Sequence, residues 1–336
     1  MKMTSERGMF IMTKTRDYFI SEKNFSENMK NIAEPYLCER AEDGYFEALD
    51  GKKLHYVFYK ADNAVGNMAI CHGFTESTEK FLEMCFYFLN MNLNVFIVDH
   101  RGHGLSHRHN DDIQVVHIKN FDQYVTDFQT FAKKVIMVKA PSLPMYMFSH
   151  SMGGAIAVQH MQTHPGVFEK VILSAPMIQA NTAGIPNKIA SFAARIFILL
   201  GKEKNKVVGY KPFNPGRTYE ESNSASEERF NYYHKKRINT PSLQTTAPSY
   251  RWVSEAVRVA SLNLDPKRNS KITAKVLLCQ PEVDAMVISE KQDVFIKQVK
   301  DGRLEKFTKC KHEIYMGFDE TVKEYLDVIE HFLFEE

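Results

Sequence analysis

The chain has 336 residues, of which 44% are hydrophobic and 25% are charged, and its formal net charge is +2 at pH 7. This composition is ordinary for a soluble globular protein. With so small a net charge, the protein is not expected to attract nucleic acid or membrane surfaces strongly through net charge alone. The length exceeds an average single domain and suits one α/β domain that carries an insertion.

The chain contains five cysteines: Cys38, Cys71, Cys85, Cys279 and Cys310. Because the number is odd and two of them fall in apolar runs typical of buried strands, we expect reduced thiols. That predicts a cytoplasmic protein, with a peripheral position at the inner membrane face as a further expectation. The apolar run 8–12 is too short for a signal peptide, and Met1, Met9 and Met12 are alternative start residues. No stretch approaches the length of a transmembrane helix.

Residues 1–40 are polar and predict a partly helical N-terminal extension. Residues 44–48 and 54–59 alternate between apolar and polar side chains about a Leu-Asp-Gly turn, which predicts a β-hairpin. Short apolar strands then alternate with helices of about ten residues or more, a pattern that favours a mostly parallel sheet covered on both faces. Strands are predicted at 68–71, 95–98, 146–149, 171–174, 276–279 and 303–307, and helices at 79–91, 121–138, 153–163, 289–299 and 321–334.

Ser151 lies in the most informative stretch of the chain, residues 149–154. An apolar run leads into this stretch, and a small-residue run compatible with a helix follows it. A serine flanked by small residues at a sharp strand-to-helix turn is the nucleophile elbow of α/β hydrolases, whose usual pattern is G-x-S-x-G. Glycine-rich serine turns are also common in proteins where the serine is not catalytic, and Ser149 replaces the first glycine here. The rest of the sequence must therefore show whether Ser151 is a nucleophile.

An acid and a histidine should follow such a serine in that order, each just after a core strand. Asp284 follows the strand predicted at 276–279, and His312 follows the strand predicted at 303–307. The spacing between them leaves room for one helix and one strand. The sequence therefore predicts a Ser-His-Asp hydrolase.

An early apolar strand is followed by His72-Gly73-Phe74. In this fold one backbone amide after that strand, and one from the residue after the nucleophile, bind the oxygen of the reacting carbonyl. We therefore expect Phe74 and Met152 to form the oxyanion hole, because backbone donors are fixed before negative charge develops.

Several histidines cluster after the strand predicted at 95–98: His100, His103, His107 and His109. A metal site is conceivable, but no carboxylate or cysteine completes a convincing ligand spacing. We expect a structural turn beneath the active site, and neither a metal nor another cofactor.

The strand rhythm breaks after residue 176 for roughly ninety residues, which is longer than ordinary connections. We expect a mainly helical cap at 177–270, inserted into a core formed by 1–176 and 271–336. Within the cap, residues 186–200 predict a helix with a wide apolar face. Such faces usually pack on a core, and the alternative is a wall for an acyl chain or a lid that faces lipid. That alternative makes Phe192, Ile196 and Phe197 candidate substrate-binding residues, together with His72.

Residues 72–73, 99–106, 150–154 and 312–313 resemble the lysophospholipase and monoacylglycerol lipase branch of the α/β hydrolases. Cap residues 223–224, 228–230, 241 and 247–256, which include the only tryptophan, are similar to the larger bacterial lysophospholipases. The resemblance implies Ser151 as nucleophile, Asp284 and His312 as its partners, and Phe74 and Met152 as oxyanion donors. One departure is the segment 281–284, which lacks the family's usual glycine before the acid.

The leading hypothesis is hydrolysis of a single-chain lipid ester, a lysophospholipid or monoacylglycerol, through an acyl-enzyme. The expected partners are this substrate and, transiently, a membrane surface at the cap, with no nucleic acid. The alternatives are a broad carboxylesterase, a peptidase on the same fold, and a non-catalytic binding protein, which would be expected to lose triad residues. An aminopeptidase needs acidic groups aimed at the substrate amine, for which the cap offers Glu220, Glu221, Glu227, Glu228 and Glu255.

Overall fold

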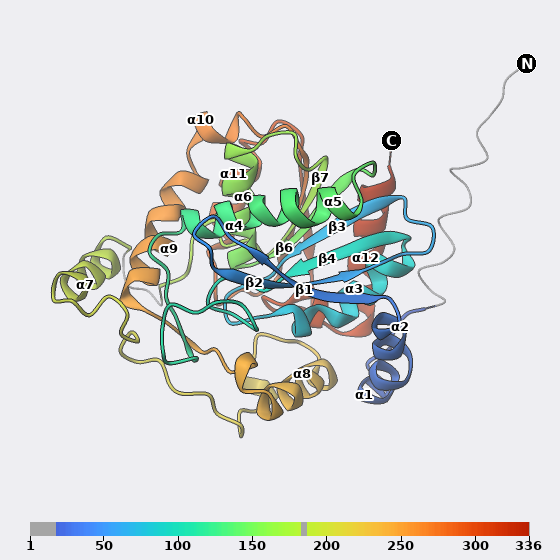
Figure 1. Ribbon diagram of the computed structural model, residues 1–336, viewed down its shortest axis with the longest axis horizontal. Coiled ribbons are helices and arrows are strands. Elements are labelled where there is room, and N and C mark those ends of the chain that lie inside the picture. Colours follow the sequence, from blue (N-terminus) through green and yellow to red (C-terminus); the bar gives the residue numbers. More distant parts are fainter. Residues whose placement is uncertain (1–17, 183–186, 336) are drawn as a thin grey trace, which may run out of the picture.

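The computed structural model describes residues 18–182 and 187–335 (Figure 1). Its centre is an eight-stranded sheet in the order β1-β2-β4-β3-β6-β7-β9-β10. β1 and β2 pair antiparallel, as do β2 and β4, whereas all other neighbours are parallel, so the predicted mostly parallel sheet is confirmed. The strands are β1 (Ala41–Glu47), β2 (Lys53–Tyr59), β3 (Gly66–Cys71), β4 (Leu93–Val98), β6 (Met145–His150), β7 (Lys170–Ser174), β9 (Lys275–Pro281) and β10 (Gly302–Phe307).

Helices cover both faces of this sheet because successive side chains of each strand point to opposite sides. Ala69 and Cys71 of β3 belong to one buried apolar cluster, and Met68 and Ile70 belong to the other. The first cluster includes α4 (Asp122–Phe131), α6 (Met152–Thr163), α9 (Tyr250–Asn263) and α11 (Ser289–Ile296). The second includes α1 (Phe25–Asn28), α2 (Glu34–Cys38), α3 (Leu82–Asn90) and α12 (Asp319–Phe334).

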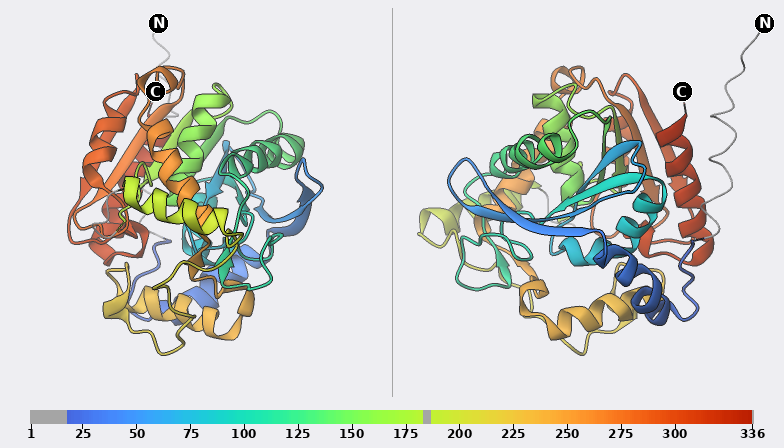
Figure 2. Two further views of the ribbon diagram at one scale, coloured as in Figure 1. Left: turned by 90° about the vertical axis from the view of Figure 1, so that its left-hand side faces the viewer. Right: turned by 45° about the vertical axis from the view of Figure 1, so that its right-hand side comes forward.

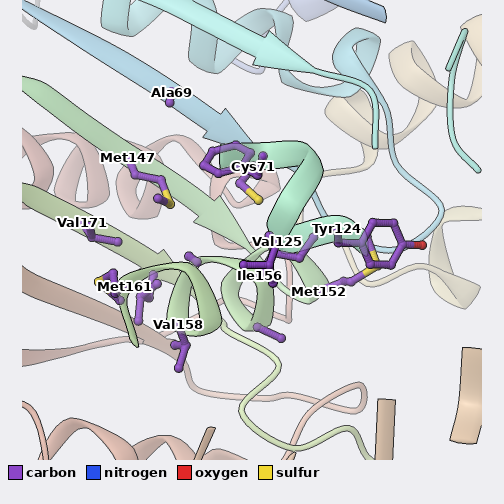
Figure 3. Packing of buried hydrophobic residues seen from close by; sticks show 14 of the residues in the cluster. Ala69, Cys71, Tyr124, Val125, Met147, Met152, Ile156, Val158, Met161 and Val171 are labelled. Atoms are coloured by element: carbon purple, nitrogen blue, oxygen red, sulfur yellow. The ribbon is translucent and has the colours of Figure 1, made fainter. Parts of the chain in front are cut away.

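Figure 3 shows the first cluster from close by, with Ala69, Met147 and Val171 on three neighbouring strands. Ile156 and Met161 of α6 lie on the same side of the sheet, and all five side chains are buried. This packing fixes α6, and with it the turn that precedes it, against the centre of the sheet.

Two local features differ from the sequence-based prediction. The helix predicted at 121–138 is interrupted by a π-helical turn (Ala132–Ile136) between α4 and α5 (Met137–Lys139). A second, two-stranded parallel sheet joins β5 (Val115–Val116) to β8 (Ala247–Pro248). Strands of two residues carry no periodicity, so the sequence does not reveal them.

The segment between β7 and β9 contains α7 (Asn187–Leu199), α8 (Glu227–Asn239), β8, α9 and α10 (Pro266–Asn269). Figures 1 and 2 show α7 at one end of the molecule beside α9, and α8 on another side near α1. α9 packs directly on α6, where Gln159 donates a 2.7 Å hydrogen bond to Asn263. The last part of the predicted cap therefore continues the helical layer of the core, and the boundary at residue 270 stays a prediction.

Within the two described ranges, no helix combines the length and the apolar character that crossing a bilayer requires. The alternative start residues predicted at positions 1, 9 and 12 lie outside these ranges.

Candidate active site

Ser151 occupies the turn between β6 and α6 with φ 51° and ψ −116°, a strained conformation for a residue with a side chain. Three backbone hydrogen bonds hold this turn. The amide of Ser151 donates to the carbonyl of Ser174 at 3.1 Å, and its carbonyl accepts from Gly154 at 2.9 Å and Met177 at 2.8 Å. The strain is therefore supported by the adjoining strand and loop, as a nucleophile elbow requires.

Small residues around Ser151 are needed because α6 approaches the sheet closely. A Cβ on Gly153 would lie 2.0 Å from the carbonyl oxygen of Cys71, and one on Gly154 would lie 2.4 Å from the side chain of Pro176. Ser149, which replaces the first glycine of the usual pattern, is buried and donates a 3.1 Å hydrogen bond to the carbonyl of Ile172. Its side chain thus lies in the core and leaves the turn intact.

Asp284 and His312 come together beside this turn. Oδ2 of Asp284 lies 2.7 Å from Nδ1 of His312, and Oδ1 accepts the amides of Met286 at 2.8 Å and Val287 at 3.0 Å. Neither side chain exposes more than 5% of its surface. Glu282 instead accepts the amide of Lys309, so Asp284, rather than Glu282, faces the histidine.

The ring of His312 lies 4.7 Å from the ring of His150, the residue before Ser151. In the described part of the chain, no hydrogen bond joins the hydroxyl of Ser151 to His312. Catalytic hydrogen bonds are often long without substrate and tighten when substrate binds, so this geometry is compatible with the predicted relay. The catalytic roles of the three residues stay predictions.

The loop after β3 starts beside the elbow, because Cys71 pairs with Ser149 across the two strands. Met152 is the first residue of α6, so its amide has no carbonyl one helical turn earlier to bind. Among the described residues, neither this amide nor that of Phe74 donates a hydrogen bond, which leaves both available to a substrate oxygen. The ring of Phe74 packs on Trp252 with centroids 4.2 Å apart.

Both ring nitrogens of His72 are engaged by the chain itself, and its role as a substrate-binding residue stays a prediction. The ring is fully buried, its Nδ1 lies 2.8 Å from the carbonyl oxygen of Gly73, and its Nε2 accepts the amide of His100 at 2.9 Å. Burial lowers the pKa of His72 and favours the neutral ring that these two bonds require. His72 supports the loop that carries Phe74.

The histidine-rich turn after β4 is built around Asp99. This buried carboxylate accepts the amides of Thr78 at 2.8 Å and Leu105 at 3.0 Å, and it lies 2.8 Å from Nδ1 of His55. A Cβ on Gly104 would lie 2.1 Å from the same carboxylate. Within residues 18–182 and 187–335, no group of three or more histidine, cysteine, aspartate or glutamate side chains is arranged to hold a metal ion.

Stability should fall as pH rises through the titration of His55. Burial acts to lower the pKa of His55, but Asp99 and Asp43 outweigh it and raise the pKa above 6.5. A histidine whose pKa is higher in the folded state than in the unfolded state stabilises the fold fully at pH values below its unfolded-state pKa. This stabilisation is lost as pH rises through the folded-state pKa. We expect His55→Gln to flatten this loss in urea unfolding measured from about pH 6 to about pH 8.5. A variant whose profile parallels the wild type would contradict the assignment.

The apolar face of α7 is turned to solvent, and its role in lining an acyl pocket stays a prediction. The exposed fraction is 66% for Phe192 and 43% for Ile196, while Phe197 stacks on Tyr250 with centroids 4.0 Å apart. A groove of about 900 Å³ lies between α7 and α9, and none of the predicted triad residues lines it. The sequence predicts that α7 is amphipathic, but it does not predict which element packs against this helix.

A buried charged cluster beside the site was not predicted. It contains Glu76, Lys80 and Glu313, with Tyr315 and His150 packed around it. The sequence offers two weak signals, the spacing of Glu76 and Lys80 and the position of Glu313 directly after His312. Neither signal distinguishes a buried cluster from solvated surface charges.

The sheet topology together with the strained serine turn defines the chain as an α/β hydrolase. The family described as serine aminopeptidase, S33, matches residues 62–319, and the chain belongs to this family. Lysophospholipase L2 of Escherichia coli (strain K12) is 27% identical over 259 residues, which cover 76% of this chain and 74% of that protein. Monoacylglycerol lipase of Mycolicibacterium smegmatis is 28% identical over 146 residues, 43% of this chain and 50% of that protein.

Among solved structures, a soluble variant of monoglyceride lipase from Saccharomyces cerevisiae superimposes with a TM-score of 0.67 at 19% identity, over 87% of this chain and 95% of that one. This likeness confirms the α/β-hydrolase fold. The predicted resemblance to the lysophospholipase and monoacylglycerol lipase branch is also confirmed, and the chain is a carboxylic ester hydrolase.

Proposed function

We propose that this enzyme cleaves the ester of a single-chain lipid, a lysophospholipid or a monoacylglycerol, through an acyl-enzyme on Ser151. The observation that carries the mechanism is the 2.7 Å pair of Asp284 and His312 beside the strained serine turn. The similarity to lysophospholipase L2 over 76% of the chain supports the substrate class.

In the proposed reaction the hydroxyl of Ser151 attacks the ester carbonyl, and Nε2 of His312 takes its proton. Asp284 holds the other ring nitrogen, which fixes the tautomer and stabilises the imidazolium that forms. The amides of Phe74 and Met152 bind the oxygen as it becomes negative. His312 returns the proton to the leaving alcohol, and water then attacks the acyl-enzyme by the same route. These steps use only groups of the chain and water.

The substrate class is tested by fatty acid release from lysophosphatidylcholine and monoacylglycerol, compared with a short nitrophenyl ester. We expect kcat/KM for at least one long-chain lipid to exceed that for the short ester by about tenfold or more, because each buried methylene contributes about 0.8 kcal/mol. A preference for the short ester would favour the broad carboxylesterase.

An aminopeptidase activity receives no support from the acidic residues of the cap. Glu255 accepts the amide of Phe121 at 2.9 Å and pairs with Arg258, and Glu227 and Glu228 are exposed in the first turn of α8. Amino-acid nitroanilides added to the same assay test this alternative. Their hydrolysis at rates above those of the esters would replace the lipase proposal.

We also propose that residues 177–270 act as a cap whose α7 region contacts membranes. Exposed apolar side chains gather on and just after α7: Ile189, Phe192, Ile196, Leu199, Leu200 and Val208. Exposed basic side chains lie among them, at Arg195, Lys202 and Lys204. An apolar face bordered by basic residues suits the interface of a bilayer that contains anionic lipid.

Replacing both Phe192 and Ile196 with serine should lower binding to vesicles of phosphatidylglycerol and phosphatidylcholine by about tenfold or more, because each side chain loses about 1.5–3 kcal/mol of burial. Co-sedimentation measures this binding. Val138→Ser, at a residue that is 70% exposed on α5, is the matched control and should bind as the wild type does. Unchanged binding of the double variant would contradict membrane contact through α7.

A further inference from the structure

The buried carboxylate of Glu76 binds the loop that carries the proposed oxyanion donor. Oε2 of Glu76 accepts the amide of Gly73 at 2.5 Å, and Oε1 accepts the hydroxyl of Tyr315 at 2.8 Å. Nζ of Lys80 lies 2.9 Å from Oε1, and Glu76 is only 5% exposed. Both oxygens are thus engaged by the chain itself.

Lys80 extends this contact to the loop that carries the proposed catalytic histidine. Its Nζ lies 2.6 Å from Oε1 of Glu313, the residue directly after His312. Lys80 stands on the short helix after the oxyanion loop (Thr78–Phe81), whereas Glu313 follows β10. One ammonium group therefore joins two carboxylates from segments that are far apart in the chain.

Glu76 and Lys80 are each held in the charged form. Burial acts to raise the pKa of Glu76, but the charge of Lys80 outweighs it and lowers that pKa below its usual value. Burial acts in the opposite direction on Lys80, and the carboxylates of Glu313 and Glu76 outweigh it and raise the pKa. A buried ion pair of this kind contributes little net stability but strongly disfavours arrangements that separate its members.

Hydrogen bonds hold the two peptides that flank the Cα atom of Gly73. The imidazole of His72 binds the carbonyl oxygen of Gly73, and Glu76 binds the amide of the same residue. Because a trans peptide is planar, fixing that carbonyl directs the amide of Phe74 the opposite way. Thr75 follows with φ 62°, an uncommon value for a residue with a side chain, so the loop depends on these contacts to keep its shape.

We propose that Glu76, Lys80 and Glu313 are positioning residues that fasten the oxyanion loop to the histidine loop and keep the amide of Phe74 aimed at the reacting carbonyl. This inference rests on the proposed serine hydrolase mechanism. The network should therefore stabilise the transition state and should not recognise the alcohol part of the substrate. Both oxygens of Glu76 already bind groups of the chain itself.

The test compares Glu76→Gln, Glu76→Ala and the double variant Glu76→Gln/Lys80→Met, which removes both charges of the fully buried pair and leaves only Glu313, whose side chain is 14% exposed, without its cation. Kinetics are measured on a short nitrophenyl ester and on a monoacylglycerol. Affinity is measured for an alkyl boronic acid, whose tetrahedral anion on Ser151 imitates the transition state. We expect kcat to fall by about ten- to a hundredfold with KM within about twofold, since misplacing one donor by about 1 Å has effects of this size.

Affinity for the boronic acid should fall in parallel with kcat. Glu76→Gln, which keeps an acceptor for the amide of Gly73, should retain more activity than Glu76→Ala. Glu83→Gln is the matched control, because it alters another buried ion pair, that of Glu83 in the first turn of α3 with Arg229, which binds neither the oxyanion loop nor Glu313. It should lower stability while the folded enzyme keeps its kcat.

Two results would overturn the inference. One is a folded double variant whose kcat and boronic acid affinity stay within about twofold of wild type. The other is a rise in KM confined to the monoacylglycerol, which would assign the network to the glycerol group. Ser151→Ala is measured alongside to separate the two proposals. If Ser151→Ala keeps its activity, the proposed serine hydrolase mechanism is wrong. If Ser151→Ala is inactive while the network variants stay active, only the inference about the network is wrong.

Discussion

Replacing Ser151 with alanine should lower kcat for ester hydrolysis by about a million-fold while the protein stays folded. Loss of the serine in a dissected serine protease has an effect of this size, and the remaining rate comes from the oxyanion donors and binding. The backbone bonds that hold the turn use the amide and carbonyl of Ser151, not its hydroxyl, so the substitution leaves them in place. Fatty acid release and labelling by a fluorophosphonate probe measure the result.

Ser149→Ala is the matched control for this experiment. It removes a hydroxyl only two residues away, which donates a hydrogen bond to the carbonyl of Ile172. Losing such a bond should destabilise the protein by about 1 kcal/mol and leave labelling intact. If Ser151→Ala kept more than about a hundredth of wild-type activity, the nucleophile would have to be another residue.

The sequence predicts the sheet, and it also predicts where the candidate site residues lie, because both follow from the same rule. Ser151, Asp284 and His312 each come after a strand of the sheet, and Phe74 comes after another. The carboxyl ends of parallel strands meet at one edge of a sheet, so residues in these positions gather there. The order of strands along the chain, and the residues that follow them, therefore predict which side chains lie together.

What the sequence does not predict depends on contacts between distant segments. The apolar pattern of α7 identifies its amphipathic face, but the outward direction of Phe192 and Ile196 depends on where α9 lies. His72 follows β3 as a substrate-binding residue would, yet its ring turns back onto the carbonyl of Gly73. Glu76 and Glu313 are more than two hundred positions apart and meet only through Lys80. Local periodicity carries no information about such contacts.

Arg229 is a second side chain whose contacts the sequence does not predict, and it holds α8 to the core. Its fully buried guanidinium donates to Glu83 at 3.1 Å, to Asp319 at 3.2 Å, and to the carbonyls of Gly317 and Ile20 at 3.0 Å each. It also lies 4.9 Å from the ring centroid of Phe25. One side chain of the inserted segment thus joins α3, the start of α12 and the N-terminal segment.

Arg229→Ala should lower the free energy of unfolding by about 3–5 kcal/mol, because it leaves the carboxylate of Glu83 buried without its cation. Burial raises the pKa of Glu83, so part of that loss should be recovered at lower pH as the carboxyl becomes protonated. Arg229→Lys should recover little, since one ammonium cannot reproduce a planar group with five donors. Urea unfolding measures all three effects.

The control for Arg229 is Arg258→Ala, which removes a half-exposed arginine paired with Asp122 and Glu255. Exposed ion pairs contribute about 0–1 kcal/mol, so this variant should unfold close to wild type. Adding Glu83→Gln to an Arg229→Met background should recover stability, because no buried charge is then left unpaired. If Arg229→Ala were no more destabilised than the Arg258 variant, α8 would have to be held by its apolar contacts alone, and the charged contacts around Glu83 would carry no stability.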